Sequence, residues 1–381
     1  MAFSFFSNKQ NSQSRIVIDI ASGSIGGAVV FLSGAGNGKT TSRPKIEYQT
    51  RISLPIRAKI DSVSLMSDTK QALEKVLGEI RKNSKAKFTE VDVVCSSPWF
   101  SARTRGVSYE KTEAFFVTEK LIREITVKES AKMKSEMDAG VLSIEERIAH
   151  IRLNGYESQN PLGKKVKRLD LLLFASFIPK DFAEQTTHSI EAILPAKRII
   201  FHSLPFVSFH TFSRIWHTEK QFAFMHIGAE LSEFLLVDGG AIAETLSFPV
   251  GVNHLVRSIA ASQDVSKELA ATSLATYSRG GADAAFNKRI ETDTSSIKEE
   301  WLAYIDQVVR ESLPDHHSVQ KMYISADSDT GPFWTQAVHP HIQNAVSLDA
   351  TTLESFVEHS PAIKLDLSLA VAVLYFNNLH T

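Results

Sequence analysis

The chain has 381 residues, which is long enough for two or more domains with sizeable cores. Its 42 basic and 43 acidic side chains nearly cancel, so overall charge gives no case for binding nucleic acid or an anionic membrane. Cys95 is the only cysteine, and the longest apolar runs, 171–178 and 369–376, are too short for a bilayer, which excludes an intramolecular disulfide and a transmembrane segment.

The N-terminal stretch, residues 1–14, carries Phe3, Phe5 and Phe6 ahead of a polar tail. It lacks the basic start and the apolar core of a secretory signal. We expect a loosely packed terminus, and the alternative is a short aromatic contact with a membrane surface or a partner.

A short stretch, Gly38, Lys39 and Thr40, matches the end of a nucleotide-binding P-loop. The earlier glycine that this pattern requires is replaced by Ser33, and the residues that follow alternate as in a strand instead of opening a helix. Without a helix N-terminus, the free N–H groups that bind phosphate are missing. We therefore predict that this stretch is the glycine-rich tip of a hairpin.

After the terminus, the pattern predicts hairpins, a helix and a buried strand. Residues 16–54 indicate strand, turn, strand, glycine-rich tip and strand. The helix that follows presents one apolar face, with Asp68 as its expected N-cap and Asn83 at its end. A buried strand, 91–98, then ends at Ser-Ser-Pro.

The next segment indicates a separate module. A long charged helix with a narrow apolar stripe covers 116–137, and 146–179 indicates two strands around a polar, turn-rich stretch, with another helix after Pro179. Four basic residues gather between these strands without the stacking aromatics of a nucleic-acid site. We interpret them as a solvated hairpin, with an anion site as the alternative; they are Lys164, Lys165, Lys167 and Arg168.

The second half begins near Lys220 and repeats the first. Residues 221–251 indicate three strands joined by a small-residue turn and a tight turn at 238–240. The chain thus contains two hairpin-plus-helix halves about 200 residues apart. Further elements are expected as helices at 252–261, 266–277 and 295–313, a strand, turn and helix within 321–338, and a closing helix at 364–376.

This duplicated layout, with 16–30 opening one half and 223–237 opening the other, resembles the actin, Hsp70 and sugar-kinase superfamily. Within it, the inserted module is similar to the one typical of the FtsA and PilM proteins, over 154–163 and 167–193. The resemblance covers nearly the whole chain. It implies an α/β, duplicated actin-like (ribonuclease H-like) ATPase fold with an inserted α+β subdomain in the first half.

The resemblance also implies how the chain divides into subdomains. Each half is interrupted, the first by the inserted FtsA/PilM-type subdomain and the second by a helical one. The expected boundaries are 14–97 with 194–218 for the first half (subdomain 1A), 98–193 for the inserted subdomain (1C), 219–262 with 314–381 for the second half (2A), and 263–313 for the helical subdomain (2B).

In this superfamily one turn from each half wraps the phosphates with backbone N–H groups, and an acidic residue at the start of each turn positions Mg²⁺. The resemblance places these turns at 19–24 and 226–233, with an adenosine-side turn at 325–329. Asp19 is then either the metal-organising acid or a turn residue that caps neighbouring N–H groups. The implied nucleotide-binding residues are Asp19, Ser22, Gly23, Ser24, Gly228, Ala229, Ser232 and Ser325, with Asp19 as the metal ligand.

Departures from the family pattern argue against hydrolysis. His226 stands where the family has an aspartate, and imidazole is a poor ligand for Mg²⁺. Glu230 would repel a triphosphate, and Asp327 with Asp329 adds negative charge at the adenosine-side turn. We therefore expect binding of ATP with Mg²⁺ to be weak or lost, and we do not expect an enzyme.

The resemblance implies a cytoplasmic scaffold of the FtsA/PilM type, docked at the inner face of the cell membrane through partners, which organises type IV pilus assembly or a cell-division machine. The expected partners are cytoplasmic peptide segments of membrane proteins, bound by strand addition at the inserted subdomain, and further copies of the chain in filaments; nucleic acid is not expected. The chain stops at Thr381 without the C-terminal amphipathic helix of FtsA, so we expect no anchor of that kind. The alternatives are an active actin-like ATPase that polymerises with Mg-ATP and a sugar-kinase-like phosphotransferase.

Overall fold

The computed structural model describes residues 13–32, 43–86, 88–137, 140–281, 283–312 and 319–379. The aromatic terminus with its three phenylalanines and the Gly38-Lys39-Thr40 stretch lie outside the described residues. The element that follows that stretch is β3 (Lys45–Ser53), a strand and not the helix that a P-loop would need. Within the described ranges, no helix combines the length and the apolar composition that crossing a membrane requires.

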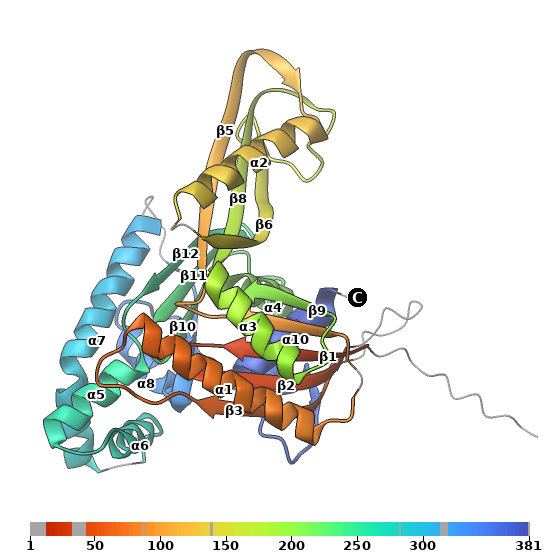
Figure 1. Cartoon of the computed structure of the whole chain (residues 1–381). Coiled ribbons are helices and arrows are strands. Elements are labelled where there is room, and N and C mark those ends of the chain that lie inside the picture. The colour runs from red at the N-terminus through yellow and green to blue at the C-terminus, as the bar shows by residue number, and fades with distance from the viewer. Residues whose placement is uncertain are drawn as a thin grey trace, which may run out of the picture.

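The first half is built on a six-stranded sheet with the strand order β15-β3-β2-β1-β4-β9. β1, β2 and β3 form an antiparallel meander, and β4 runs parallel to β1. Helices α1 and α3 cover one face, and α4 and α10 cover the other (Figure 1). The bounds are β1 (Gln13–Ile20), β2 (Ser24–Leu32), α1 (Ser62–Asn83), β4 (Glu90–Cys95), α3 (Lys180–Ile193), β9 (Arg198–Ser203), α4 (Leu204–Ile215), β15 (Glu358–His359) and α10 (Leu367–Leu379).

The second half repeats this topology on a five-stranded sheet, β12-β11-β10-β13-β14. β10, β11 and β12 form the antiparallel meander, and β13 runs parallel to β10 as β4 does to β1. The duplication predicted from the sequence is confirmed. The bounds are β10 (Phe222–Ile227), β11 (Ser232–Asp238), β12 (Ala241–Phe248), α5 (Val252–Gln263), α6 (Lys267–Ser278), α7 (Ala284–Ser312), β13 (Met322–Ala326), α8 (Gly331–Val338), β14 (Ala345–Ser347) and α9 (Thr351–Glu354).

One helical layer is shared by the two halves. α4 and α10 lie between the sheets, and their apolar side chains pack with residues of both sheets in one core. Every residue of α10 from Leu369 to Phe376 is buried, because a helix between two sheets has no solvent face. This explains the unbroken apolar run of the sequence. Helices α5, α6, α7 and α8 pack on the outer face of the second sheet.

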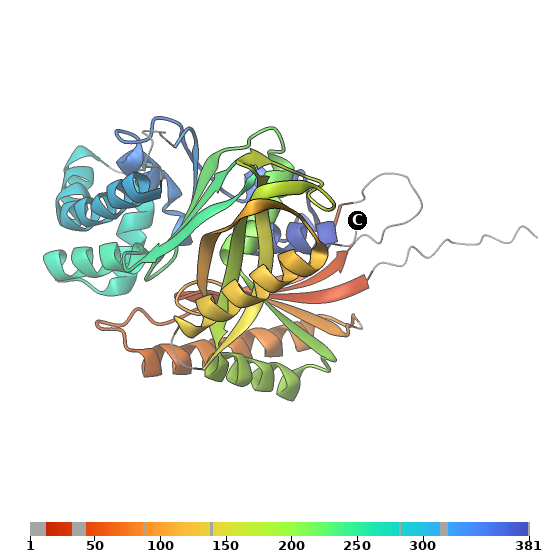
Figure 2. The ribbon, with the colours of Figure 1, turned by 90° about the horizontal axis from the view of Figure 1, so that it is seen from above.

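The inserted module is a four-stranded antiparallel sheet, β5-β8-β6-β7, with α2 packed on it. It projects from the body and, seen from above, lies over the boundary between the two halves (Figures 1 and 2). The sequence pattern does not predict β5, because its side chains are largely polar or charged and only partly buried, so no apolar alternation marks it. The bounds are β5 (Ser101–Phe116), α2 (Glu119–Ser135), β6 (Val141–Leu153), β7 (Tyr156–Glu157) and β8 (Lys165–Pro179).

The N-cap predicted for α1 is wrong. The helix begins at Ser62, and its N-cap is Asp61, whose Oδ1 accepts a hydrogen bond from the Ser64 N–H over 2.9 Å. Asp68 lies inside the helix and accepts two hydrogen bonds from Arg57, over 2.7 and 2.8 Å. The first turn of the helix contains Ser-Val-Ser, and these residues are poor helix formers. The helical pattern of the sequence is therefore clear only beyond the first turn.

Helix α3 belongs by its packing to the first half. Phe182, Ala183 and Ile190 are buried in the same core as the apolar face of α1, and the Phe182 ring stacks on Trp99 at 4.6 Å. The boundary expected at 193 would assign this helix to the inserted subdomain. We propose that the inserted subdomain ends near Pro179 instead.

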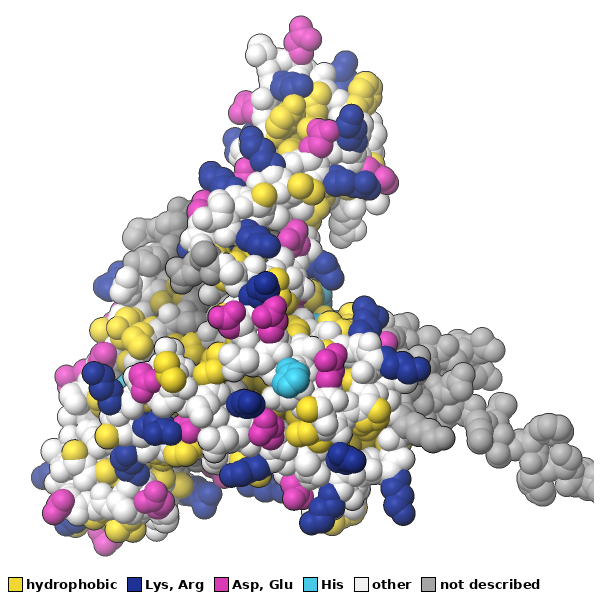
Figure 3. All heavy atoms as spheres, viewed as in Figure 1, with side chains coloured by type: hydrophobic (Ala, Val, Ile, Leu, Met, Phe, Trp, Pro, Cys, Tyr) yellow, Lys and Arg dark blue, Asp and Glu magenta, His cyan; other side chains and the backbone are white. Residues whose placement is uncertain are grey.

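Charged side chains of both signs are interspersed over the face shown in Figure 3. The same holds at the basic group of the inserted module, where Arg168 forms an ion pair with Asp170, whose oxygens lie 2.9 and 3.0 Å from its Nε. This mixed surface fits the net charge of −1.

Candidate functional site

Two turns, one from each half, meet at the centre of the molecule. The turn between β1 and β2 holds Ser22 and Gly23, and the turn between β10 and β11 holds Ala229 and Glu230. The Glu230 N–H donates to Ser22 Oγ over 3.1 Å. A methyl group added at Gly23 would lie 2.1 Å from the Ala229 Cβ, so the two turns pack directly against each other. The structure thus brings the two expected phosphate turns together without a gap at this point.

Asp19, at the end of β1, is 2% exposed and is paired with an arginine. Arg51 of β3 donates to Asp19 Oδ2 over 2.7 Å, to Ser24 Oγ over 2.8 Å, and to both carboxylate oxygens of Asp366 over 2.5 and 3.0 Å. Burial raises the pKa of Asp19, and the charge of Arg51 opposes that shift. Although burial favours its neutral form, Asp366 and Asp19 hold the pKa of Arg51 well above its ordinary value. We call these three residues the Asp19–Arg51–Asp366 triad.

The second turn is held by the start of α5. The Val252 and Asn253 N–H groups donate to the carbonyls of Gly228 and Ala229, over 3.0 and 2.8 Å. A helix N-terminus can bind an anion with such N–H groups, but here they bind the turn itself. The Glu230 carboxylate is paired as well.

Arg257 of α5 neutralises the carboxylate that was expected to repel phosphate. Its two terminal nitrogens donate to the two oxygens of Glu230 over 3.1 and 2.7 Å. The Asn253 side chain adds a third donor at 2.6 Å. Glu230 is 7% exposed, and this bidentate pair offsets part of the cost of burying its charge.

The other residues that were expected to bind the nucleotide form hydrogen bonds within the second half. His226 Nδ1 lies 2.9 Å from Ser325 Oγ. Ser232 Oγ donates to the Val250 carbonyl over 2.7 Å and accepts from Trp301 Nε1 over 3.1 Å, which directs it into the core. Over the described ranges, no group of three or more His, Cys, Asp or Glu side chains is arranged to hold a metal ion.

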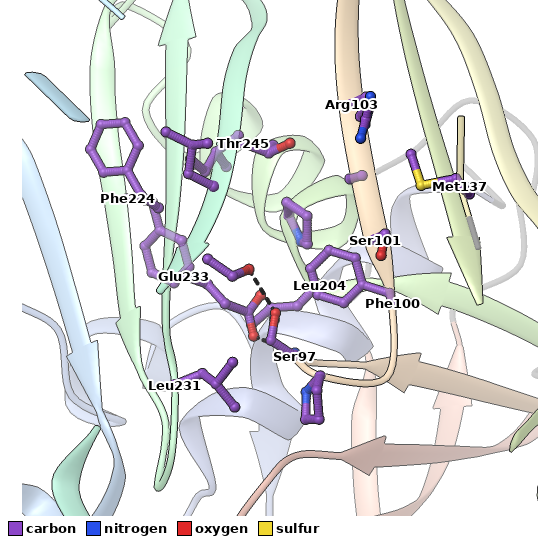
Figure 4. Close-up of a pocket in the computed structure, with 17 residues that line it drawn as sticks. Ser97, Phe100, Ser101, Arg103, Met137, Leu204, Phe224, Leu231, Glu233 and Thr245 are labelled. Carbon is purple, nitrogen blue, oxygen red and sulfur yellow. Dashed lines mark hydrogen bonds between the residues drawn. The ribbon is translucent and has the colours of Figure 1, made fainter. Parts of the chain in front are cut away.

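A pocket of about 410 Å³ lies beside the turns, where the first half, the inserted module and the second half meet (Figure 4). Its lining is mixed, with Ser97, Ser101, Arg103 and Ser247 beside a larger apolar part. The Glu233 carboxyl lies at its floor, where Oε1 accepts from the Ser97 N–H over 2.7 Å. Glu233 Oε2 and Thr245 Oγ1 are buried and have no hydrogen-bond partner among the described residues. Because buried polar atoms are normally paired, these two mark a place where a polar group of a bound molecule could form hydrogen bonds. The apolar lining comes from Pro98, Phe100, Ala102, Met137, Leu204, Pro205, Phe224, Leu231, Phe234, Leu235 and Leu246.

The acid at the pocket floor should make stability depend on pH. Burial raises the pKa of Glu233 from 4.5 to about 8; the Ser97 N–H opposes the shift, and the charges of Asp19 and Asp327 add to it. A carboxyl whose pKa rises on folding stabilises fully below its ordinary pKa and loses that contribution as pH rises through the folded value. We expect the free energy of unfolding to fall by a few kcal/mol, on the order of 4, between pH 4.5 and 8.

Urea denaturation at several pH values measures this effect. The variant Glu233→Gln should show a clearly smaller pH-dependent fall, whereas Glu299→Gln, which changes an exposed residue of α7, should keep the full one. Identical profiles for Glu233→Gln and the unmodified protein would rule out Glu233 as the source.

Another buried carboxylate joins the inserted module to the first half. Glu145 of β6 is 4% exposed and accepts hydrogen bonds from the Ser203 N–H over 3.0 Å and from Ser203 Oγ over 2.6 Å. Ser176 Oγ of β8 also donates to it. On the other side, His150 Nε2 lies 3.4 Å from the Asp238 carbonyl of the second half. The module that forms one wall of the pocket is therefore tied to both halves.

Arg51, Arg257 and the Glu233 carboxyl are the site residues that the sequence does not reveal. Arg51 and Glu233 lie in predicted strands, but their roles depend on strand register and on the meeting of the halves.

The fold of the chain matches solved structures of actin-like proteins. It is similar to a chain of the PilM-PilN type IV pilus biogenesis complex, with 12% identity, a TM-score of 0.66, and coverage of 96% of this chain and 98% of that chain. It is also similar to the ethanolamine utilization protein EutJ from Carboxydothermus hydrogenoformans (10% identity, TM-score 0.49, coverage 97% and 91%). A third is a protein of unknown function with an actin-like ATPase fold from Bacteroides thetaiotaomicron (9% identity, TM-score 0.43, coverage 98% and 99%).

No protein-family model matches the sequence, and no curated protein matches it. The structural likeness therefore establishes the fold. The duplicated actin-like fold with an inserted subdomain, expected from the sequence, is confirmed.

Proposed function

We propose that this actin-like chain is a PilM-type scaffold, which binds peptide segments of membrane proteins and thereby docks at the inner face of the cell membrane in type IV pilus assembly. The match over nearly the full length of both chains to a member of the PilM-PilN complex supports this proposal over a role in cell division. Self-association into short filaments is part of the same proposal. The observation that carries it is the pocket at the base of the inserted module.

The chemistry of the pocket suits a peptide. The apolar part of the lining accepts an aliphatic or aromatic side chain, and Glu233 and Thr245 at the floor and wall can each form a hydrogen bond. An extended peptide could fill the pocket with an apolar side chain. The backbone N–H groups beside that side chain, or a neighbouring side-chain amide, could then form hydrogen bonds with both Glu233 and Thr245.

Strand β5 offers the rest of the binding surface. In the described part of the chain it is an edge strand of the four-stranded sheet, paired with β8, and it also contacts β12 of the second half. Its first residue, Ser101, is exposed and lines the pocket (Figure 4). A peptide that pairs with the part of this edge that β12 leaves free could therefore place one side chain in the pocket, which combines backbone affinity with side-chain specificity.

Closing the pocket mouth should abolish peptide binding. We would probe the purified full-length chain with an array of overlapping peptides that covers the cytoplasmic segments of membrane proteins of the host cell. Ser101→Trp should weaken binding of the selected peptides at least tenfold, because the indole occupies the mouth. The measurement is fluorescence anisotropy with each labelled peptide.

The matched control is Thr112→Trp, which adds the same ring at an exposed position near the far end of β5. It should bind as the unmodified protein does. Equal binding by both variants would place the peptide elsewhere, and selection of peptides from division proteins alone would assign the scaffold to the division machine. An array without any bound peptide would contradict the proposed function.

A further inference from the structure

We infer that the guanidinium of Arg51 supplies the positive charge that a divalent metal supplies in actin-like ATPases, so that this cleft is closed by the chain's own side chains. Sheet register places the group there. Asp19 of β1 pairs with Gly26 of β2, and Gly26 pairs with Arg51 of β3, so the three residues form one row. A methyl group at Gly26 would lie 2.6 Å from Arg51 Nη2. The glycine therefore leaves open the path along which Arg51 reaches Asp19.

This contact gives the Asp19 carboxylate a cationic partner. Asp19 is 2% exposed, and a buried carboxylate is tolerated as an anion when a cation with good hydrogen-bond geometry lies beside it. Arg51 provides that geometry, since it donates to Asp19, Asp366 and Ser24 at once. A metal ion at Asp19 would have to displace the guanidinium or lie against its charge.

The second turn does not supply the missing half of a metal-nucleotide site. Mg²⁺ takes oxygen ligands in octahedral geometry, and the residue at the position of the second acid is His226. The Glu230 carboxylate is paired with Arg257. At the contact of Gly23 with Ala229 there is no space for a phosphate group between the turns. The residues present therefore do not fit a magnesium nucleotide.

The contacts that close the cleft also complete the pocket. Ser97 of the first half donates through its N–H to Glu233 of the second half, and its Oγ lies 2.7 Å from Ser247 Oγ. Both halves therefore line the same pocket. This inference concerns the cleft alone, and a failure of the peptide experiment would leave it intact.

Thermal unfolding of the full chain, with and without millimolar Mn²⁺, tests the inference. The unmodified protein should have the same Tm in both. Arg51→Met leaves Asp19 and Asp366 without their cation, so its Tm should fall by roughly 5 °C or more. Mn²⁺ should restore part of that loss, because the two carboxylates can then bind the ion. The double variant with Asp19→Asn should no longer respond to Mn²⁺.

If Arg51→Met does not fold, Arg51→Lys is used in the same Tm measurement. It keeps the charge but loses the bidentate geometry, so we expect an intermediate Tm and no response to Mn²⁺. Titration calorimetry of the unmodified protein with Mg-ATP should detect no binding. Micromolar binding that Asp19→Ala abolishes would overturn the inference, and so would an Arg51→Met variant that keeps the unmodified Tm without metal.

Discussion

Replacement of Glu145 by alanine is expected to lower the free energy of unfolding by about 3–5 kcal/mol. The carboxylate accepts hydrogen bonds from Ser176 and from both donors of Ser203, and all of these groups are buried. Its removal leaves these donors without a partner at the joint between the inserted module and the first half. Urea denaturation measures the loss, and hydrogen exchange should show faster exchange in β6 and β8.

Two variants calibrate this prediction. Glu146→Ala changes the next residue of the same strand, which is exposed, and should cost no more than about 0.5 kcal/mol. Glu145→Gln keeps one acceptor oxygen and should recover part of the loss. A Glu145→Ala variant as stable as Glu146→Ala would mean that the joint is held by apolar packing instead.

Replacement of Gly23 by alanine is expected to cost about 1–3 kcal/mol, because the new methyl group would lie 2.1 Å from the Ala229 Cβ. The obstacle is a side-chain atom of a tight turn in the other half, so neither group can move aside without shifting backbone. The strain acts across the cleft and should push the halves apart. Urea denaturation measures the stability, and small-angle scattering measures the opening.

A double variant separates this contact from general damage to the turn. Gly23→Ala combined with Ala229→Gly moves the methyl group to the opposite side of the contact and should recover most of the loss. Gly78→Ala, in an open position on α1, should instead stabilise by about 0.5–1 kcal/mol, since alanine is the better helix former. If the double variant were as unstable as Gly23→Ala, the two turns would not be in the contact described.

One consequence for function is shared by Glu145, by Glu233 and by the contact between the two turns. Glu145 fixes the inserted module to the first half, and Gly23 fixes the first half to the second. The pocket with Glu233 at its floor exists only where all three meet. Loss of peptide binding in either destabilised variant would therefore follow from the pocket geometry and would not by itself identify a contact residue.

The elements that the sequence predicted correctly are those whose pattern is local. The two meanders were recognisable because apolar strands alternate with small-residue turns, and α10 because its apolar run is continuous. The pattern failed at β5, which is polar along its length, and at the start of α1, where Asp61 and not Asp68 is the cap. A helix N-cap is identified by one hydrogen bond from its side chain to a backbone N–H group, and the residue composition does not reveal that bond.

For the candidate site too, some features follow from the sequence and others only from the tertiary structure. The sequence by itself determined that Asp19 ends a strand at a small-residue turn and that a similar turn follows His226. Only the tertiary structure decided that Arg51 reaches Asp19 across Gly26, because this depends on the register of three strands. It also decided that Glu233 lies under a pocket shared by three parts of the chain, because buried charge and unpaired atoms arise from contacts between residues far apart in sequence.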